Sequence, residues 1–222
     1  MQMKNEINTQ ENESIASPKR LLQLFIRPKR FFTDFQSLNR DQYYFFAYLA
    51  AVYVVMDRLD SRLFKEQTLE NGDVEKYSIL IHSWINYWGF GAIIAIFAAF
   101  IVWFVYGWWY EQRLKWCGVK DQPSELIRQV NVVQWSIVAI PVILMTAVQT
   151  VLYKDYLEAY DAPDLWGGII VLFFSVYSCW VSYTAVKTVF NANKYAILWF
   201  FFLPLMLYIM AIIIALMAVI GA

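Results

Sequence analysis

The sequence has few of the side chains on which most catalytic and metal sites depend. It contains one histidine and two cysteines, which excludes metal sites built on paired histidines and most histidine-dependent catalytic triads. The motifs H-E-x-x-H, G-x-S-x-G and G-x-G-x-x-G are missing, as is the Walker-type glycine loop. We therefore expect a protein that is not an enzyme and that holds no cofactor and no metal ion.

Charge is missing from long stretches of the chain. Residues 195–220 contain no charged side chain, no asparagine and no glutamine, and a helix of that length exceeds the roughly 30 Å hydrocarbon core of a bilayer at about 1.5 Å per residue. The overall composition, 60% hydrophobic and 19% aromatic, predicts an all-α integral membrane protein with a bundle of five transmembrane helices over residues 43–222. The predicted spans are residues 43–59, 87–110, 132–153, 165–186 and 195–220.

The lysines and arginines are distributed unevenly over this five-span topology. Most of them fall in the N-terminal segment, in the second loop and in the fourth loop, which lie on one side of the membrane. Short cytoplasmic loops collect lysine and arginine. With five spans the pattern therefore predicts a cytoplasmic N-terminus and a C-terminus on the outer side. A four-span chain without the span that begins at residue 43 would also leave most of the cations on one side, so charge alone does not decide between the two counts.

The chain before the first span divides into two parts. Residues 1–17 are rich in Asn, Gln, Glu and Ser and have too few apolar residues to fold, so we expect a disordered cytoplasmic head. Residues 18–42 mix cations with large apolar side chains, and Pro28 is expected to begin a second helical turn. This pattern predicts an interfacial amphipathic segment that binds anionic lipid, with a plain positive-inside anchor as the alternative. The predicted lipid-contacting residues are Lys19, Arg20, Arg27, Lys29, Arg30, Phe31 and Phe32.

Polar residues also occur inside the predicted spans, where lipid does not solvate them. Three serines in the fourth span recur at i, i+3 and i+7, which suits close packing against a neighbouring helix. The alternative is a polar path between the third and fourth spans. Against a path stand the lack of any carboxylate inside an apolar run and the lack of an inverted repeat. The residues of this packing surface or path are Gln134, Pro141, Gln149, Ser175, Ser178, Ser182 and Lys187.

The order of these features resembles a known family. A polar head, the basic run from Arg27 to Phe32, five closely spaced spans, Gly118 after the second span, and the stretches Trp135–Pro141 and Ala185–Lys187 are similar to the Yip-domain family, the Ypt-interacting membrane proteins. The Asp-Leu-x-Gly-Pro signature of the eukaryotic trafficking members is missing, so the resemblance is to the bacterial-type branch. It implies a protein of the bacterial inner membrane that oligomerises and acts as a scaffold or trafficking factor.

These observations support two hypotheses of function. The first is a non-enzymatic membrane scaffold that works through helix contacts and anionic lipids, with further copies of itself or other membrane proteins as partners and no nucleic acid. The alternative is a small-solute or ion transporter, or a channel, with a polar path between the third and fourth spans. A flux measurement in liposomes separates the two.

Overall fold

The structure is a computed structural model that describes residues 17–35, 37–69, 78–162 and 165–221. Every regular element in those ranges is helical. The predicted disordered head, residues 1–17, lies outside the described residues except for Ser17.

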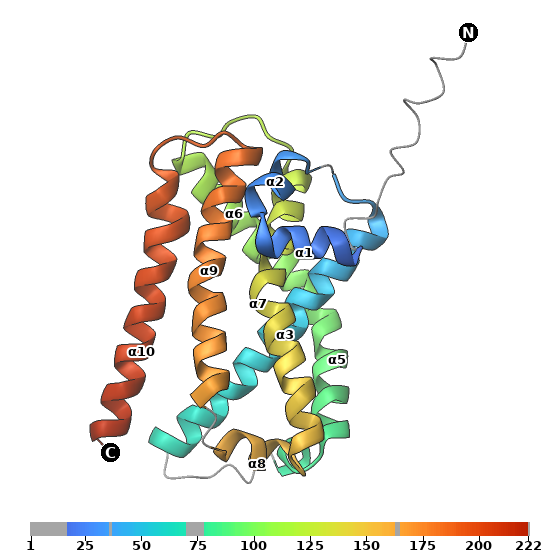
Figure 1. The fold of residues 1–222 in the computed structure, drawn as a ribbon, viewed down its shortest axis with the longest axis vertical. Helices are drawn as coiled ribbons and strands as arrows, with labels where there is room; N and C mark the ends of the chain where they lie inside the picture. Colours follow the sequence, from blue (N-terminus) through green and yellow to red (C-terminus); the bar gives the residue numbers. More distant parts are fainter. Residues whose placement is uncertain (1–16, 36, 70–77, 163–164, 222) are drawn as a thin grey trace.

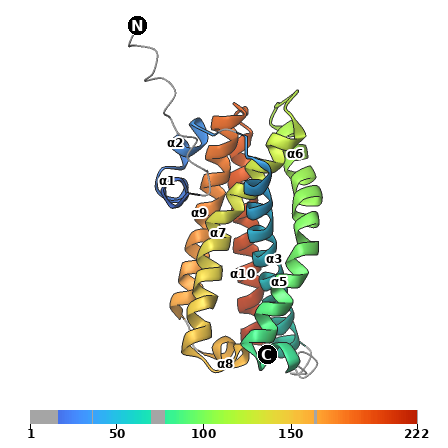
Figure 2. The same cartoon turned by 90° about the vertical axis from the view of Figure 1, so that its right-hand side faces the viewer.

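Two short helices open the described chain. In α1 (Pro18–Ile26) the Ser17 hydroxyl oxygen accepts a hydrogen bond from the Arg20 N–H at 3.4 Å, and α2 (Pro28–Thr33) begins directly after it. Both helices begin with a proline, whose fixed φ suits the first helical position and whose missing N–H costs nothing there. α1 lies across the long helices in Figure 1 and is seen end-on beside them in Figure 2.

The long helices run side by side and form the bundle (Figures 1 and 2). The first of them, α3 (Arg40–Leu69), continues ten residues past the end of the first predicted span. α1, α2 and the connection after α9 lie at one end of the bundle, and α8 and the C-terminus lie at the other. The remaining elements are α4 (Ser78–Ile81), α5 (Trp84–Ile101), the π-helical turn η2 (Val102–Tyr106), α6 (Gly107–Trp116), α7 (Ser124–Leu152), α8 (Tyr156–Asp161), α9 (Leu165–Val189), the π-helical turn η3 (Leu198–Phe202) and α10 (Leu203–Gly221).

Three helices of the described chain are long and apolar enough to cross a membrane: Trp84–Trp116, Ser124–Leu152 and Trp166–Val189. The stretch Leu198–Ile214 is a shorter apolar helix. α3 is not among them, because tyrosines interrupt its apolar stretch and charged residues come after it. The all-helical membrane fold is thus confirmed for these residues, whereas the count of five spans is not.

Small residues form the contact between α3 and α5. Ala47 and Ala51 of α3 and Ala95 and Ala98 of α5 are buried, and the two helices pack against each other. Because these side chains are small, the backbones can approach closely, which favours dispersion contacts between helices in lipid. Other positions on α5 carry large apolar side chains, such as Ile93 with 60% exposure, and these suit contact with acyl chains.

Candidate functional site

The N-terminal helix pair, α1 and α2, contacts α9 through aromatic residues. The Phe25 and Phe174 rings meet edge to face with their centroids 6.0 Å apart. Tyr177 Oη donates a hydrogen bond to the Phe25 carbonyl oxygen at 2.6 Å, and α2 packs against α9 as well. The pair is therefore part of the bundle.

One apolar face of the helix pair points into the protein. Leu24, Phe31 and Phe32 are 0%, 2% and 2% exposed and belong to the main core. The sequence placed Phe31 and Phe32 among the lipid contacts, but the structure buries both rings in the bundle, because α9 and its neighbours present an apolar surface at this end. Leu22 and Ile26 of α1 are exposed and are the apolar groups of the pair that can meet lipid.

The cations of the helix pair remain outside this core. Arg27, Lys29 and Arg30 are exposed and line an open groove of about 690 Å³ between α2 and α9, which we call the basic groove. One carboxylate, Asp34, also lines it, so the cations outnumber the anions by three to one. Lys19 is exposed and Arg20 half-buried on α1, away from the groove lining. Three cations held beside a membrane-spanning helix form a surface that suits the headgroups of anionic lipids.

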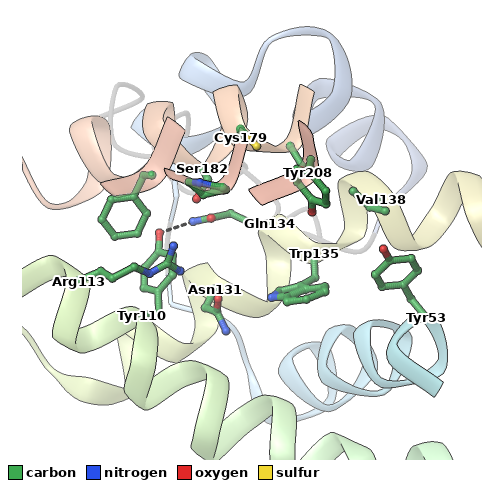
Figure 3. Close-up of a pocket in the computed structure, with 13 residues that line it drawn as sticks. Tyr53, Tyr110, Arg113, Asn131, Gln134, Trp135, Val138, Cys179, Ser182 and Tyr208 are labelled. Atoms are coloured by element: carbon green, nitrogen blue, oxygen red, sulfur yellow. Dashed lines mark hydrogen bonds between the residues drawn. The ribbon is translucent and has the colours of Figure 1, made fainter. Parts of the chain in front are cut away.

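A second hollow lies inside the bundle, where α3, α6, α7, α9 and α10 meet (Figure 3). Its volume is about 140 Å³. We call it the polar cavity. The polar residues that line it include Tyr110, Arg113, Asn131, Gln134, Ser178 and Ser182.

Tyr110 and Arg113 of α6 lie one helical turn apart, and both contact the ring of Phe200. Gln134 Nε2 donates a hydrogen bond to Tyr110 Oη at 2.5 Å, which joins α7 to α6 (Figure 3). The guanidinium carbon of Arg113 lies 5.4 Å from the centroid of the Tyr110 ring and 4.6 Å from that of Phe200. A terminal guanidinium nitrogen donates to the Trp199 carbonyl oxygen at 3.4 Å. Aromatic faces and one carbonyl thus fix the position of this cation.

The end of α6 is tied to the connection between α9 and η3. Gly118 has φ +76°, and the Val119 N–H donates to the Leu114 carbonyl oxygen at 3.1 Å, as in the helix C-terminal motif that favours glycine. The Asn193 N–H donates to the Cys117 carbonyl oxygen at 3.0 Å. These bonds hold η3, with its aromatic residues, against Arg113.

The structure brings together only part of the predicted polar path. Gln134, Ser178 and Ser182 line the polar cavity. Ser175 is buried outside its lining, and its carbonyl oxygen accepts a hydrogen bond from Ser178 Oγ at 2.7 Å. Gln149 is half-buried farther along α7 and does not line the cavity. The intramembrane polar residues therefore do not form one continuous row.

Two further predicted path residues have local structural roles. The sequence offered Pro141 as a break in a helix, but α7 continues on both sides of it, since neighbouring groups in a bundle can satisfy the carbonyl that proline leaves without a donor. The sequence also predicts that Lys187 extends toward the membrane surface. In the structure its Nζ donates to the Ala192 carbonyl oxygen at 2.6 Å, so that Lys187 caps the connection after α9 at that end of the bundle.

Sequence reasoning missed Arg113 and Asn131, because it ended the second span at Tyr110 and treated residues 111–131 as a loop. The helix instead continues to Trp116. The i, i+3 spacing of Tyr110 and Arg113 was the available signal, since in a continued helix it places both on one face.

Comparison with known families shows that the model of the Yip1 domain matches residues 22–216. No curated protein and no solved structure matches the chain. The match begins within α1, extends through most of α10, and includes both the basic groove and the polar cavity. The chain thus belongs to the Yip1 domain family.

Proposed function

We propose that this protein is a non-enzymatic membrane scaffold. It gathers anionic lipids at the end of the bundle that carries the basic groove, and it organises other membrane proteins either through these lipids or by direct contact. The main support for the proposal is how the helix pair, α1 and α2, is packed against the bundle. Phe31 and Phe32 are buried in the bundle, while Arg27, Lys29 and Arg30 stay exposed around the basic groove. A rigidly held cluster of cations attracts anionic headgroups without having to order itself first.

The proposed topology has five spans, formed by α3, by α5 with η2 and α6, by α7, by α9 and by η3 with α10. The basic groove then faces the cytoplasm, where the leaflet is anionic. In this arrangement the C-terminus is on the outer side, and the membrane is the bacterial inner membrane. Support comes from the up-and-down arrangement of these helices and from the position of α1 and α2 at one end of the bundle (Figure 1).

The exposed apolar surfaces of the bundle suggest which partners the protein has. Large exposed apolar side chains on α5 and α10, such as Phe97 and Ile214, suit contact with lipid or with helices of other copies. A transporter or channel is not favoured, because the polar residues of the third and fourth spans do not all meet: Gln149 lies away from the polar cavity.

Replacing Lys29 and Arg30 by glutamine should abolish most of the preference for anionic lipid. Each cation contributes roughly 1 kcal/mol of attraction near an anionic membrane. In reconstituted protein, spin-labelled phosphatidylglycerol should associate more strongly than spin-labelled phosphatidylcholine with the wild type, and about equally with the double variant. High salt should weaken the preference in the wild type as well.

The matched control removes two cations from the same end of the bundle but outside the groove. Lys120 and Lys194 are exposed and do not line the basic groove, so Lys120→Gln with Lys194→Gln should leave the preference nearly intact. An equal loss in both double variants would mean that total charge at this end, and not the groove, selects the lipid.

A further inference from the structure

Arg113 is half-buried and has no anionic partner among the residues that the structure describes. Its Nε is buried and makes no hydrogen bond. Burying a charge away from water is costly unless an opposite charge or several hydrogen bonds offset the loss of hydration. The Trp199 carbonyl and the two aromatic rings supply only part of that compensation.

Asn131 presents a second unsatisfied donor to the same cavity. Its side chain is 4% exposed, and its Nδ2 has no hydrogen-bond partner. Asn131 lies beside Arg113 in the lining of the polar cavity (Figure 3). The Nε–H of Arg113 and the Nδ2 amide of Asn131 therefore have no acceptor in the described protein.

The size of the polar cavity limits the size of a ligand that could accept hydrogen bonds from Arg113 and Asn131. At about 140 Å³ it is several times the roughly 30 Å³ that one water molecule occupies in the liquid, but it is smaller than the roughly 300–1,000 Å³ of drug-sized pockets. An arginine fork together with an amide donor matches the oxygens of a tetrahedral oxyanion.

We propose that the polar cavity binds a phosphate group, with Arg113 and Asn131 as its principal donors. The group is either the phosphate of a lipid headgroup that enters between the helices or free inorganic phosphate. This site is separate from the basic groove: it lies inside the bundle, and none of its residues lines the groove. It is therefore tested independently of the proposed scaffold role.

Asn131→Asp is the sharpest variant for a test. The change keeps the shape of the side chain and places a carboxylate beside Arg113, so that the protein supplies its own anion and an added phosphate meets a negative charge. Arg113→Gln removes the cation itself. We expect each variant to weaken phosphate binding at least about tenfold, because a charge-assisted hydrogen bond contributes roughly 1.5–3 kcal/mol.

Arg128→Gln is the matched control. Arg128 also has a buried Nε without a hydrogen bond, and its guanidinium carbon lies 5.2 Å from the Phe104 ring centroid, but it does not line the polar cavity. The full chain, purified in phosphate-free detergent solution, is titrated by calorimetry with inorganic phosphate, with short-chain phosphatidic acid and with the matching diacylglycerol, which lacks the phosphate. Circular dichroism confirms that each variant is folded.

The proposal predicts binding to the wild type and to Arg128→Gln, and its loss in Asn131→Asp. Binding of both phosphate ligands shows that the phosphate group alone suffices, and binding of phosphatidic acid alone identifies a lipid headgroup. Equal binding of diacylglycerol, no binding of either phosphate ligand, or undiminished binding to folded Asn131→Asp overturns the proposal. Should Arg113→Gln fail to fold, Asn131→Asp still decides the outcome.

Discussion

Replacing Phe31 and Phe32 together by alanine should detach the N-terminal helix pair from the bundle. Both rings are 2% exposed and pack edge to face with their centroids 5.1 Å apart. A buried phenylalanine changed to alanine costs about 3–5 kcal/mol, and a six-residue helix such as α2 does not stay helical in water without packing. In the double variant, trypsin should cut after Lys29 and Arg30 much faster than in the wild type.

The control for this prediction comes from α1. Leu22 and Ile26 are 58% and 64% exposed, so Leu22→Ala with Ile26→Ala removes apolar side chains of comparable character without opening the core. This variant should keep the wild-type cleavage rate. If the phenylalanine variant is cut no faster than the control, the helix pair is not held by its buried face.

A larger side chain in the contact between α3 and α5 should destabilise the protein. Ala95 is 0% exposed, and leucine at this position would have to push α3 away or adopt a strained rotamer. Overpacking of this kind typically costs about 1–3 kcal/mol. Ala95→Leu should therefore lower the thermal unfolding midpoint of the detergent-solubilised protein by several degrees.

The same substitution three residues earlier provides the comparison. Ala92 lies on the exposed side of α5, where a larger apolar side chain meets lipid or detergent. Ala92→Leu should leave the unfolding midpoint nearly unchanged. A similar loss of stability in both variants would show that the small residues of α5 do not face α3.

The fold class could be predicted from the sequence because the bilayer imposes a simple rule. Runs of about twenty uncharged residues must be helices, since lipid satisfies no backbone hydrogen bonds. The ends of these helices could not be predicted in the same way. Hydropathy marks where lipid ends, whereas a helix such as α6 continues through Glu111 and Arg113 as long as its backbone bonds and packing continue.

The basic groove was predicted in part. Alternation of cations with phenylalanines indicates an amphipathic segment, and Pro28 indicates where its second helix begins. The pattern does not say whether the apolar face meets lipid or protein, because both offer the same apolar environment. Only the position of α9 decides that Phe31 and Phe32 are buried in the bundle.

The polar cavity could be predicted least. Gln134, Ser178 and Ser182 drew attention as polar residues in apolar runs, but Arg113 and Asn131 lie at the ends of runs, where charge and amides are common. Arg113 and Asn131 meet because α6 and α7 pack against each other, and the hydrogen bond from Asn193 to Cys117 holds the last hairpin, with η3, against α6. Such long-range contacts leave no pattern in a single sequence.

The proposed function rests on five spans with the basic groove in the cytoplasm, and the locations of the two chain ends test this premise directly. A fluorescent reporter that matures only in the cytoplasm and a phosphatase that is active only outside it are fused in turn to each end of the full chain. Five spans predict fluorescence from the N-terminal fusion and phosphatase activity from the C-terminal fusion. Both ends on the same side of the membrane, or an N-terminus outside the cytoplasm, would contradict the proposed topology and with it the scaffold role of the basic groove.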